Sequence, residues 1–238
     1  MVELIERIKE YLTFNKEEAI GLMVSALVIG FVFAFKDWSL SNFVLAVIIA
    51  LLSFLFHTTA QKIAALKVGF KAEYKVWWYG LGISAILAFV SNGRFWWIIL
   101  PGGVSFSLLA GLRLGRFRYG LNYLPMGAIG LTGPIASIVL GTIFKNINMW
   151  FLADSSILFN NIFIFNLAYA VCQMLPIPPL DGHYMFYASR LWYAFLFGAI
   201  AVYAVLAIAL GFYSWIIALL AGALIWLVYY ISFEKGAW

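Results

Sequence analysis

Two histidines and one aspartate have the types and spacing that suggest chemistry at a metal. His57 and Gln61 lie four residues apart in a long apolar run, so on a helix both side chains project from one face. Asp181 and His183 follow a proline-rich stretch much later in the chain. An ionisable side chain in apolar, membrane-like surroundings is costly and marks a functional site by default. One histidine and one aspartate would make half of a metal site.

The proline-rich stretch LPIPPLDG, residues 175–182, is expected to end the helix before it. Proline removes amide donors and pushes the preceding residue out of the helical region. Asp181 therefore has a second candidate role, as the N-cap of a helix that begins near Tyr184. His57 also has a simpler candidate role, in a structural hydrogen bond or a headgroup contact near a helix end. The residue types alone leave these alternatives open.

Composition predicts an integral membrane protein. Of 238 residues, 65% are hydrophobic and 11% are charged, against roughly 25% charged in ordinary soluble domains. A soluble core of this size cannot hide so much apolar surface, whereas a lipid bilayer can cover it. The formal net charge of +5 is not gathered in a basic face with readable motifs, so we expect no nucleic-acid partner. The single cysteine, Cys172, excludes an intrachain disulfide and a cysteine-based zinc knuckle.

The apolar runs predict an all-α polytopic membrane protein with about six to eight transmembrane segments of about 20 residues each. The candidate segments are residues 19–35, 42–61, 76–92, 95–112, 122–144, 157–176, 187–210 and 214–232. Glycines and Pro101 interrupt the third and fourth, so the region around 76–112 is also compatible with a short, partly inserted strand or a re-entrant structure. Residues 1–18 predict an amphipathic helix, interfacial or solvated, before a single transmembrane domain over 19–238.

Basic residues predict how this domain is oriented. They form two groups, Lys62, Lys67, Lys71 and Lys75, and Arg113, Arg116 and Arg118. The positive-inside rule places both groups in the cytoplasm. Counting crossings from them puts the N-terminus and the end of the bundle that carries His57 and Asp181 toward the cytoplasmic side of a multi-pass protein.

Three ordered motifs resemble those of the site-2 proteases, the zinc-dependent intramembrane metalloproteases. LPIPPLDG is similar to their N-x-x-P-x-P-x-x-D-G signature, and FHTTAQK, residues 56–62, stands where the family has H-E-x-x-H on a transmembrane helix. GPIAS, residues 133–137, resembles the G-P-x-A-N element that lies between the two. The resemblance spans roughly residues 42–190 and implies the family's fold for that core.

In the family, two histidines and the aspartate hold zinc, and the glutamate is the general base. The resemblance implies zinc-ligand positions at His57 and Asp181, with Gln61 in place of the second histidine and Thr58 in place of the glutamate. Gln173 stands at the asparagine that begins the second signature and is thought to steady the reacting peptide.

The remaining matches concern the third element and the substrate. Ser137 replaces the asparagine that ends the third element. The resemblance also places Pro176, Pro178 and Gly182 beside a bound substrate.

These substitutions predict weak or absent zinc. Glutamine is a neutral, weak ligand, and without tightly held zinc the bound water is not acidified toward a pKa of about 7. Threonine accepts no proton near neutral pH, so base assistance worth roughly 10²- to 10⁴-fold is lost as well. His183 is a candidate substitute ligand, because it lies two residues after Asp181 and an i, i+2 pair in extended backbone projects to one side.

Three functions from different classes remain. The first is a site-2-protease-like membrane protein without efficient proteolysis, which binds transmembrane segments or a membrane partner in the inherited cleft. The second is a working zinc protease that cleaves single-pass substrates. The third is a transporter or channel, for which the sequence has no repeated pair of broken helices and no chain of intramembrane charges.

Overall fold

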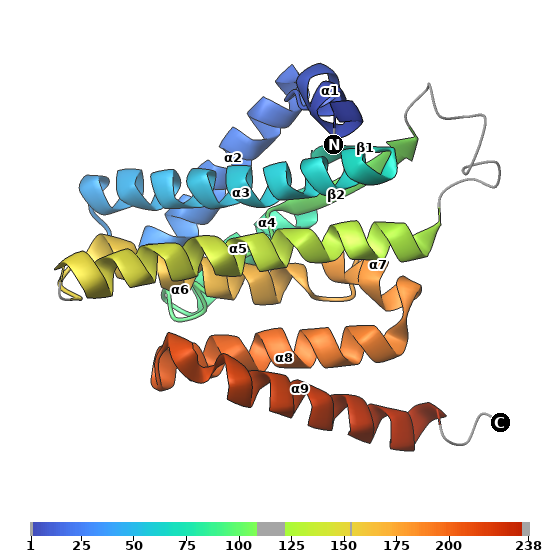
Figure 1. Cartoon of the computed structure of the whole chain (residues 1–238). Coiled ribbons are helices and arrows are strands. Elements are labelled where there is room, and N and C mark those ends of the chain that lie inside the picture. The colour runs from blue at the N-terminus through green and yellow to red at the C-terminus, as the bar shows by residue number, and fades with distance from the viewer. Residues whose placement is uncertain (1, 109–121, 153, 235–238) are drawn as a thin grey trace.

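The computed structural model describes residues 2–108, 122–152 and 154–234. Its long helices are α2 (Lys16–Ala34), α3 (Leu40–Val68), α5 (Tyr123–Leu152), α6 (Ile157–Gln173), α8 (Arg190–Ala209) and α9 (Trp215–Tyr229). In Figure 1, α3, α5 and α8 run roughly alongside one another, with α2 at one edge of the bundle and the α8–α9 pair at the other. The N-terminus, the sheet and α7 (Asp181–Ala188) lie at the same end.

The N-terminal segment forms two helices rather than one. The helix expected over residues 1–18 is α1 (Val2–Tyr11), and α2 begins only at Lys16. Asn15 separates them, because its backbone is extended and its N–H donates to the Glu18 carboxylate at 2.9 Å. Glu18 is therefore part of the first turn of α2.

Helix α3 is longer than the apolar run that predicts it. It begins after Ser39, whose hydroxyl accepts from the Asn42 amide at 3.1 Å, and it ends at Gly69. Gly69 has a φ of 95°, a left-handed conformation that glycine adopts without a Cβ penalty. Lys62 and Lys67, expected in a basic loop, are thus helical.

The region between α3 and α5 contains the sheet. Strands β1 (Phe70–Val76) and β2 (Gly102–Leu108) pair antiparallel, with Phe70 opposite Leu108, and α4 (Trp78–Val90) lies between them in sequence. The transmembrane segment expected over residues 95–112 was wrong, since its described part is a turn followed by β2. The strand that was the alternative for this region is present instead, and its glycines allow close packing, because a Cβ at Gly102 or Gly103 would collide with the carbonyl of Lys75 or Pro179.

A single proline inside α5 and a cluster of prolines after α6 shape the second half of the bundle. Pro134 lies inside α5, and the prolines of the LPIPPLDG stretch end α6 at Gln173. Helix α7 begins at Asp181 and not near Tyr184, and its N-cap is Leu180. Asp181 is consequently a buried first-turn residue, and the N-cap alternative for it was wrong.

Five described helical segments are long and apolar enough to cross a membrane, namely α2, α3, α5, α8 and Trp215–Phe233, which continues α9. Helices α4 and α6 are apolar but shorter. The prediction of an all-α polytopic membrane protein is confirmed. The three arginines at positions 113, 116 and 118 lie outside the described residues.

Candidate functional site

His57 joins three helices at the end of the bundle that carries α7. Its Nε2 lies 2.8 Å from Asp181 Oδ2 on α7, and its Nδ1 lies 2.9 Å from Ser137 Oγ on α5. The ring also packs on Tyr169 of α6, with centroids 4.7 Å apart. His57 and Asp181 are 2% and 1% exposed, so this contact is shielded from solvent. The structure brings together residues that lie 124 positions apart in sequence.

Gln61 is held by the backbone of α5. Pro134 has no N–H, so the carbonyl four residues earlier, at Gly130, lacks its usual helical donor. Gln61 Nε2 donates to that carbonyl at 3.3 Å. Gly133 allows the approach, because a Cβ there would collide with the His57 ring and with the Gln61 amide. The GPIAS element therefore packs directly on both positions of the first motif.

Gln173 and Tyr184 contact strand β2. Gln173 Nε2 donates to the Gly102 carbonyl at 2.9 Å, and the Tyr184 hydroxyl donates to the Val104 carbonyl at 3.0 Å. Alternate residues of an antiparallel strand direct their backbone groups away from the partner strand. Next to the paired residues Val76 and Gly102, the Trp77 amide donates to the Pro101 carbonyl across the sheet. Because the direction alternates along the strand, the carbonyls of Gly102 and Val104 point away from β1. Side chains from α6 and α7 thus occupy the carbonyls of this edge.

The opposite edge of the sheet is also occupied. The Tyr74 amide on β1 donates to Glu18 Oε1 at 2.8 Å. Glu18 in turn forms a buried ion pair with Lys62, with Nζ and Oε1 2.8 Å apart. Lys62 Nζ also donates to the Thr13 carbonyl at 2.8 Å and lies 4.3 Å from the centroid of the Phe14 ring.

The donor set at His57 does not fit a catalytic zinc. A catalytic zinc is held by three His, Cys, Asp or Glu ligands and keeps a fourth position for water, whereas this site offers only His57 and Asp181, which are hydrogen-bonded to each other at 2.8 Å. The other nearby acceptors are Asp181 Oδ1 and the neutral amide oxygen of Gln61, both buried and without a protein donor in the described ranges. Those ranges contain no group of three or more His, Cys, Asp or Glu residues that could hold a metal.

His183 packs beside other residues of α7. Its ring lies 4.8 Å from the Tyr187 ring and 5.3 Å from the Tyr184 ring, and burial lowers the pKa of its imidazole. A lower pKa leaves the ring neutral at pH 7. It does not join His57 and Asp181 in a metal-binding group within the described residues.

The other predicted positions differ in exposure. Thr58 is buried beside His57, whereas Pro176 and Pro178 are exposed. Gly182 is buried, and a Cβ there would collide with the Met174 carbonyl. Its lack of a side chain therefore serves the contact between α7 and the end of α6.

Two polar contacts were not anticipated from the sequence. The Glu18–Lys62 pair joins residues that read as surface charges, and no local pattern couples them. Asn166 is fully buried, and its Nδ2 donates to Ser53 Oγ at 2.9 Å. Ser53 lies four residues before His57, so the helical spacing of α3 is the one signal that could have placed it on the site-facing side.

The chain is similar to a curated protein of Methanocaldococcus jannaschii named "Putative zinc metalloprotease MJ0611". The two are 32% identical over 171 residues, which cover 71% of this chain and 83% of the relative. No family model and no solved structure matches. The 171 aligned residues far exceed the combined length of the three short motifs. The chain belongs to the site-2 protease family of membrane metalloproteases.

Proposed function

We propose that this chain is a non-proteolytic member of its family that binds transmembrane segments of partner proteins. The observation that carries the proposal is the direct hydrogen bond between His57 and Asp181 at 2.8 Å. In the family these positions share a metal ion, whereas here each is the other's partner. A site that hydrolyses peptide bonds through zinc needs three protein ligands and an open position for water.

The substituted positions support the same proposal. Gln61 and Gln173 each donate their amide to a backbone carbonyl, Gly130 O and Gly102 O respectively. Thr58 supplies no base near neutral pH. The residues in place of the second ligand, the general base and the asparagine therefore serve packing between helices and the sheet rather than chemistry.

An apolar groove beside α5 is the surface we assign to the partner. It has a volume of about 430 Å³ and lies between α5, α8 and α9. Small residues, Ala199 and Ala218, line it together with Ile135 and Leu196. Both alanines are buried between α8 and α9, whereas Ile135 is 45% exposed and offers an apolar surface against which a transmembrane helix can pack in lipid. The groove thus suits a helical segment, whereas the edge carbonyls of β2 are already taken.

Photocrosslinking tests both halves of the proposal. A photoreactive residue at Ile135 is compared with one at Ile83, which is equally exposed, 45% and 44%, but lies on α4 away from the groove. With a synthetic single-pass peptide in the same vesicles, we expect crosslinks from position 135 and intact peptide by mass spectrometry. Equal crosslinking at both positions would reject the groove, and zinc-dependent cleavage of the peptide would reject the loss of proteolysis.

The alternative is an active zinc-dependent protease, which the name of the Methanocaldococcus jannaschii relative favours. It requires zinc at His57 and Asp181 with an unusual third ligand. Cleavage that stops with a chelator and returns with added zinc would establish it.

A further inference from the structure

A second hollow lies at the end of the bundle away from His57. It has a volume of about 600 Å³ and is lined by Asn42, Leu45 and Ile49 of α3, by Asn161 of α6 and by Trp96. Leu45 precedes His57 by 12 residues, or about 18 Å along a helix. The cavity is therefore separate from the candidate active site, and its size is within the usual range of about 300–1,000 Å³ for ligand pockets.

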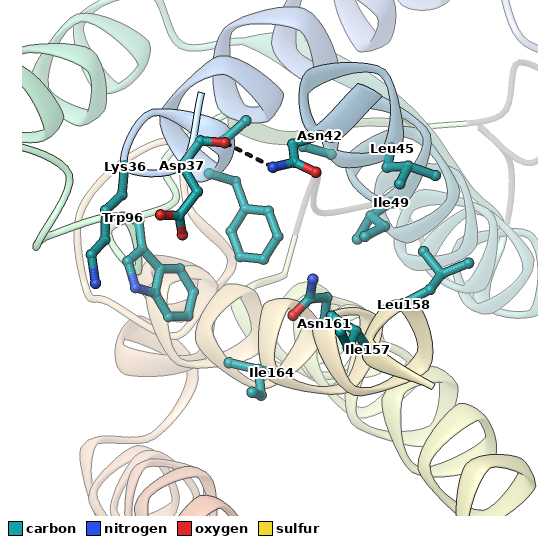
Figure 2. A pocket seen from close by; sticks show the side chains of 13 residues that line it. Lys36, Asp37, Asn42, Leu45, Ile49, Trp96, Ile157, Leu158, Asn161 and Ile164 are labelled. Atoms are coloured by element: carbon teal, nitrogen blue, oxygen red, sulfur yellow. Dashed lines mark hydrogen bonds between the residues drawn. The ribbon is translucent and has the colours of Figure 1, made fainter. Parts of the chain in front are cut away.

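The polar groups of this cavity are arranged at its mouth and on one wall. Lys36 and Asp37, in the turn between α2 and α3, are exposed, and within the described part of the chain neither side chain forms an ion pair. Asn42 donates to the Asp37 backbone carbonyl at 2.8 Å, which fixes the turn against α3. Figure 2 shows Lys36, Asp37 and Trp96 together on one side of the hollow, and Asn161 pointing into it from α6.

Asn161 has no hydrogen-bond partner for its side chain among the residues that the structure describes. Around it the wall is apolar, with Ile49, Leu158 and Ile164. A half-buried amide in such surroundings loses hydration without gaining a protein partner, which costs free energy unless a ligand compensates. The amide is thus positioned to contact a polar group that enters the hollow.

The surroundings place the mouth at the depth of lipid headgroups. Trp96 lines the cavity and Trp38 is exposed on the neighbouring turn. Tryptophan concentrates at the membrane–water interface. Leu45, Ile157 and Leu158 extend the apolar wall onto the exposed surface of the bundle, where lipid chains would lie.

We propose that this cavity binds a zwitterionic membrane lipid, one whose headgroup carries a phosphate next to an amine. Lys36 pairs with the phosphate and Asp37 with the ammonium group. The amides of Asn42 and Asn161 contact the ester or phosphate oxygens below. The lipid chain follows the wall of Leu45, Leu158 and Ile157 into the bilayer. Adjacent charges of opposite sign match such a headgroup, whereas an anionic lipid would meet the Asp37 carboxylate.

Native mass spectrometry of the full chain tests this, with phosphatidylethanolamine and phosphatidylglycerol of identical acyl chains as probes. We expect tighter binding of phosphatidylethanolamine. Lys36→Gln should weaken it by up to about fivefold, the worth of one solvent-exposed ion pair. Asp37→Asn should weaken the binding of phosphatidylethanolamine and abolish its preference over phosphatidylglycerol. Both side chains are exposed, so neither change should disturb folding.

Lys145→Gln is the matched control. Lys145 is a cation at the same end of the bundle, but it pairs with Asp154 at 2.8 Å and does not line the cavity. We expect the control to bind both lipids as the parent does. Equal binding of the two lipids by the parent, no binding at all, or equal effects of Lys36→Gln and Lys145→Gln would overturn the proposal.

Discussion

Pro134 shapes the candidate site although it forms no hydrogen bond with His57 or Asp181. Its missing N–H leaves the Gly130 carbonyl free for the Gln61 amide. Beside it, Gly133 lets α5 pack against the His57 ring. The backbone of α5 therefore positions both Gln61 and His57 on the facing side of α3.

Gly133→Ala should destabilise the protein, because the new methyl group meets the buried His57 ring. Overpacking of this kind costs about 1–3 kcal/mol. Gly82→Ala on α4 is the control, since nothing lies within 4 Å of a Cβ there. Replacing a helical glycine with alanine at such a site should be neutral or stabilise by up to about 1 kcal/mol. Thermal unfolding in detergent measures both, and equal midpoints would show that the helices separate easily at Gly133.

Gln61→His should raise zinc affinity by about tenfold or more, because it adds an imidazole on the face of α3 that carries His57. Gln61→Leu removes the amide without adding a ligand and serves as the control. Zinc titration by calorimetry measures all three proteins. If the histidine variant gains nothing over the parent, the site has lost its geometry as well as its ligands.

Adding Thr58→Glu to Gln61→His should restore slow cleavage of a model transmembrane peptide, while each single change does little. Metal and base act as a unit, so their effects on rate are strongly non-additive. Cleavage is followed by mass spectrometry with and without zinc. Rates for the double variant no higher than for Gln61→His alone would mean that Gln173 or the β2 contacts block the substrate.

At the scale of elements, the Glu18–Lys62 pair ties α2 to α3 and to β1. Both side chains are at most 5% exposed, and Glu18 also accepts from the amides of Asn15 and Tyr74. The desolvation of such a pair is expensive, so its net contribution is small even though loss of one partner is costly. The pair fixes the sheet at the end of the bundle where Gln173 meets β2.

Lys62→Met should destabilise the protein by about 3–5 kcal/mol, because it leaves the Glu18 carboxylate buried without its cation. The double change Glu18→Gln with Lys62→Met should recover part of that loss. Lys145→Met, which breaks a pair whose Asp154 is 52% exposed, should cost at most about 1 kcal/mol. Unfolding midpoints of the three variants in detergent measure these changes. An equal loss of stability for Lys62→Met and Lys145→Met would contradict a stabilising role for the buried Glu18–Lys62 pair.

The sequence predicted most helices but not the sheet contacts, and particular residues show why. Apolar runs are local signals, so the ends of α2, α4, α6, α8 and α9 were located to within about three residues. Helices α3 and α5 continue about seven and eight residues beyond the predicted spans, because polar residues extend both helices past their apolar runs. The approach of His57 to Asp181 was expected from the proline-broken helix before Asp181 and from the resemblance to the site-2 protease motifs. Lys62 was misjudged as part of a basic loop, because its partner Glu18 lies 44 positions away and charge patterns do not specify tertiary pairs. Residues 95–112 were misjudged as a span, because an apolar segment reads alike whether it forms a helix or a strand.

For the whole molecule, the re-entrant region between α3 and α5 sets the orientation that we propose. Because β1, α4 and β2 return to the end of the bundle from which they start, the end of α3 and the start of α5 lie at the same end of the bundle (Figure 1). Lysines at 67, 71 and 75 lie at this end, and from the positive-inside rule we propose that it faces the cytoplasm.

Cysteine accessibility tests this orientation. The natural Cys172 is buried, so it should react little with a membrane-impermeant thiol reagent. A cysteine in place of exposed Glu17 should be labelled only in inside-out vesicles, and one in place of exposed Asp37 only in right-side-out vesicles. Labelling of both positions from the same side would contradict the proposed topology.

Zinc stoichiometry tests the central claim most directly, because the account holds that His57 and Asp181 bind each other and not a metal. The measurement is plasma emission spectrometry on the full chain, purified without chelator and then dialysed. The account predicts far less than one zinc per chain. One zinc per chain that survives dialysis would contradict it and would establish a metal site built from this unusual set of ligands.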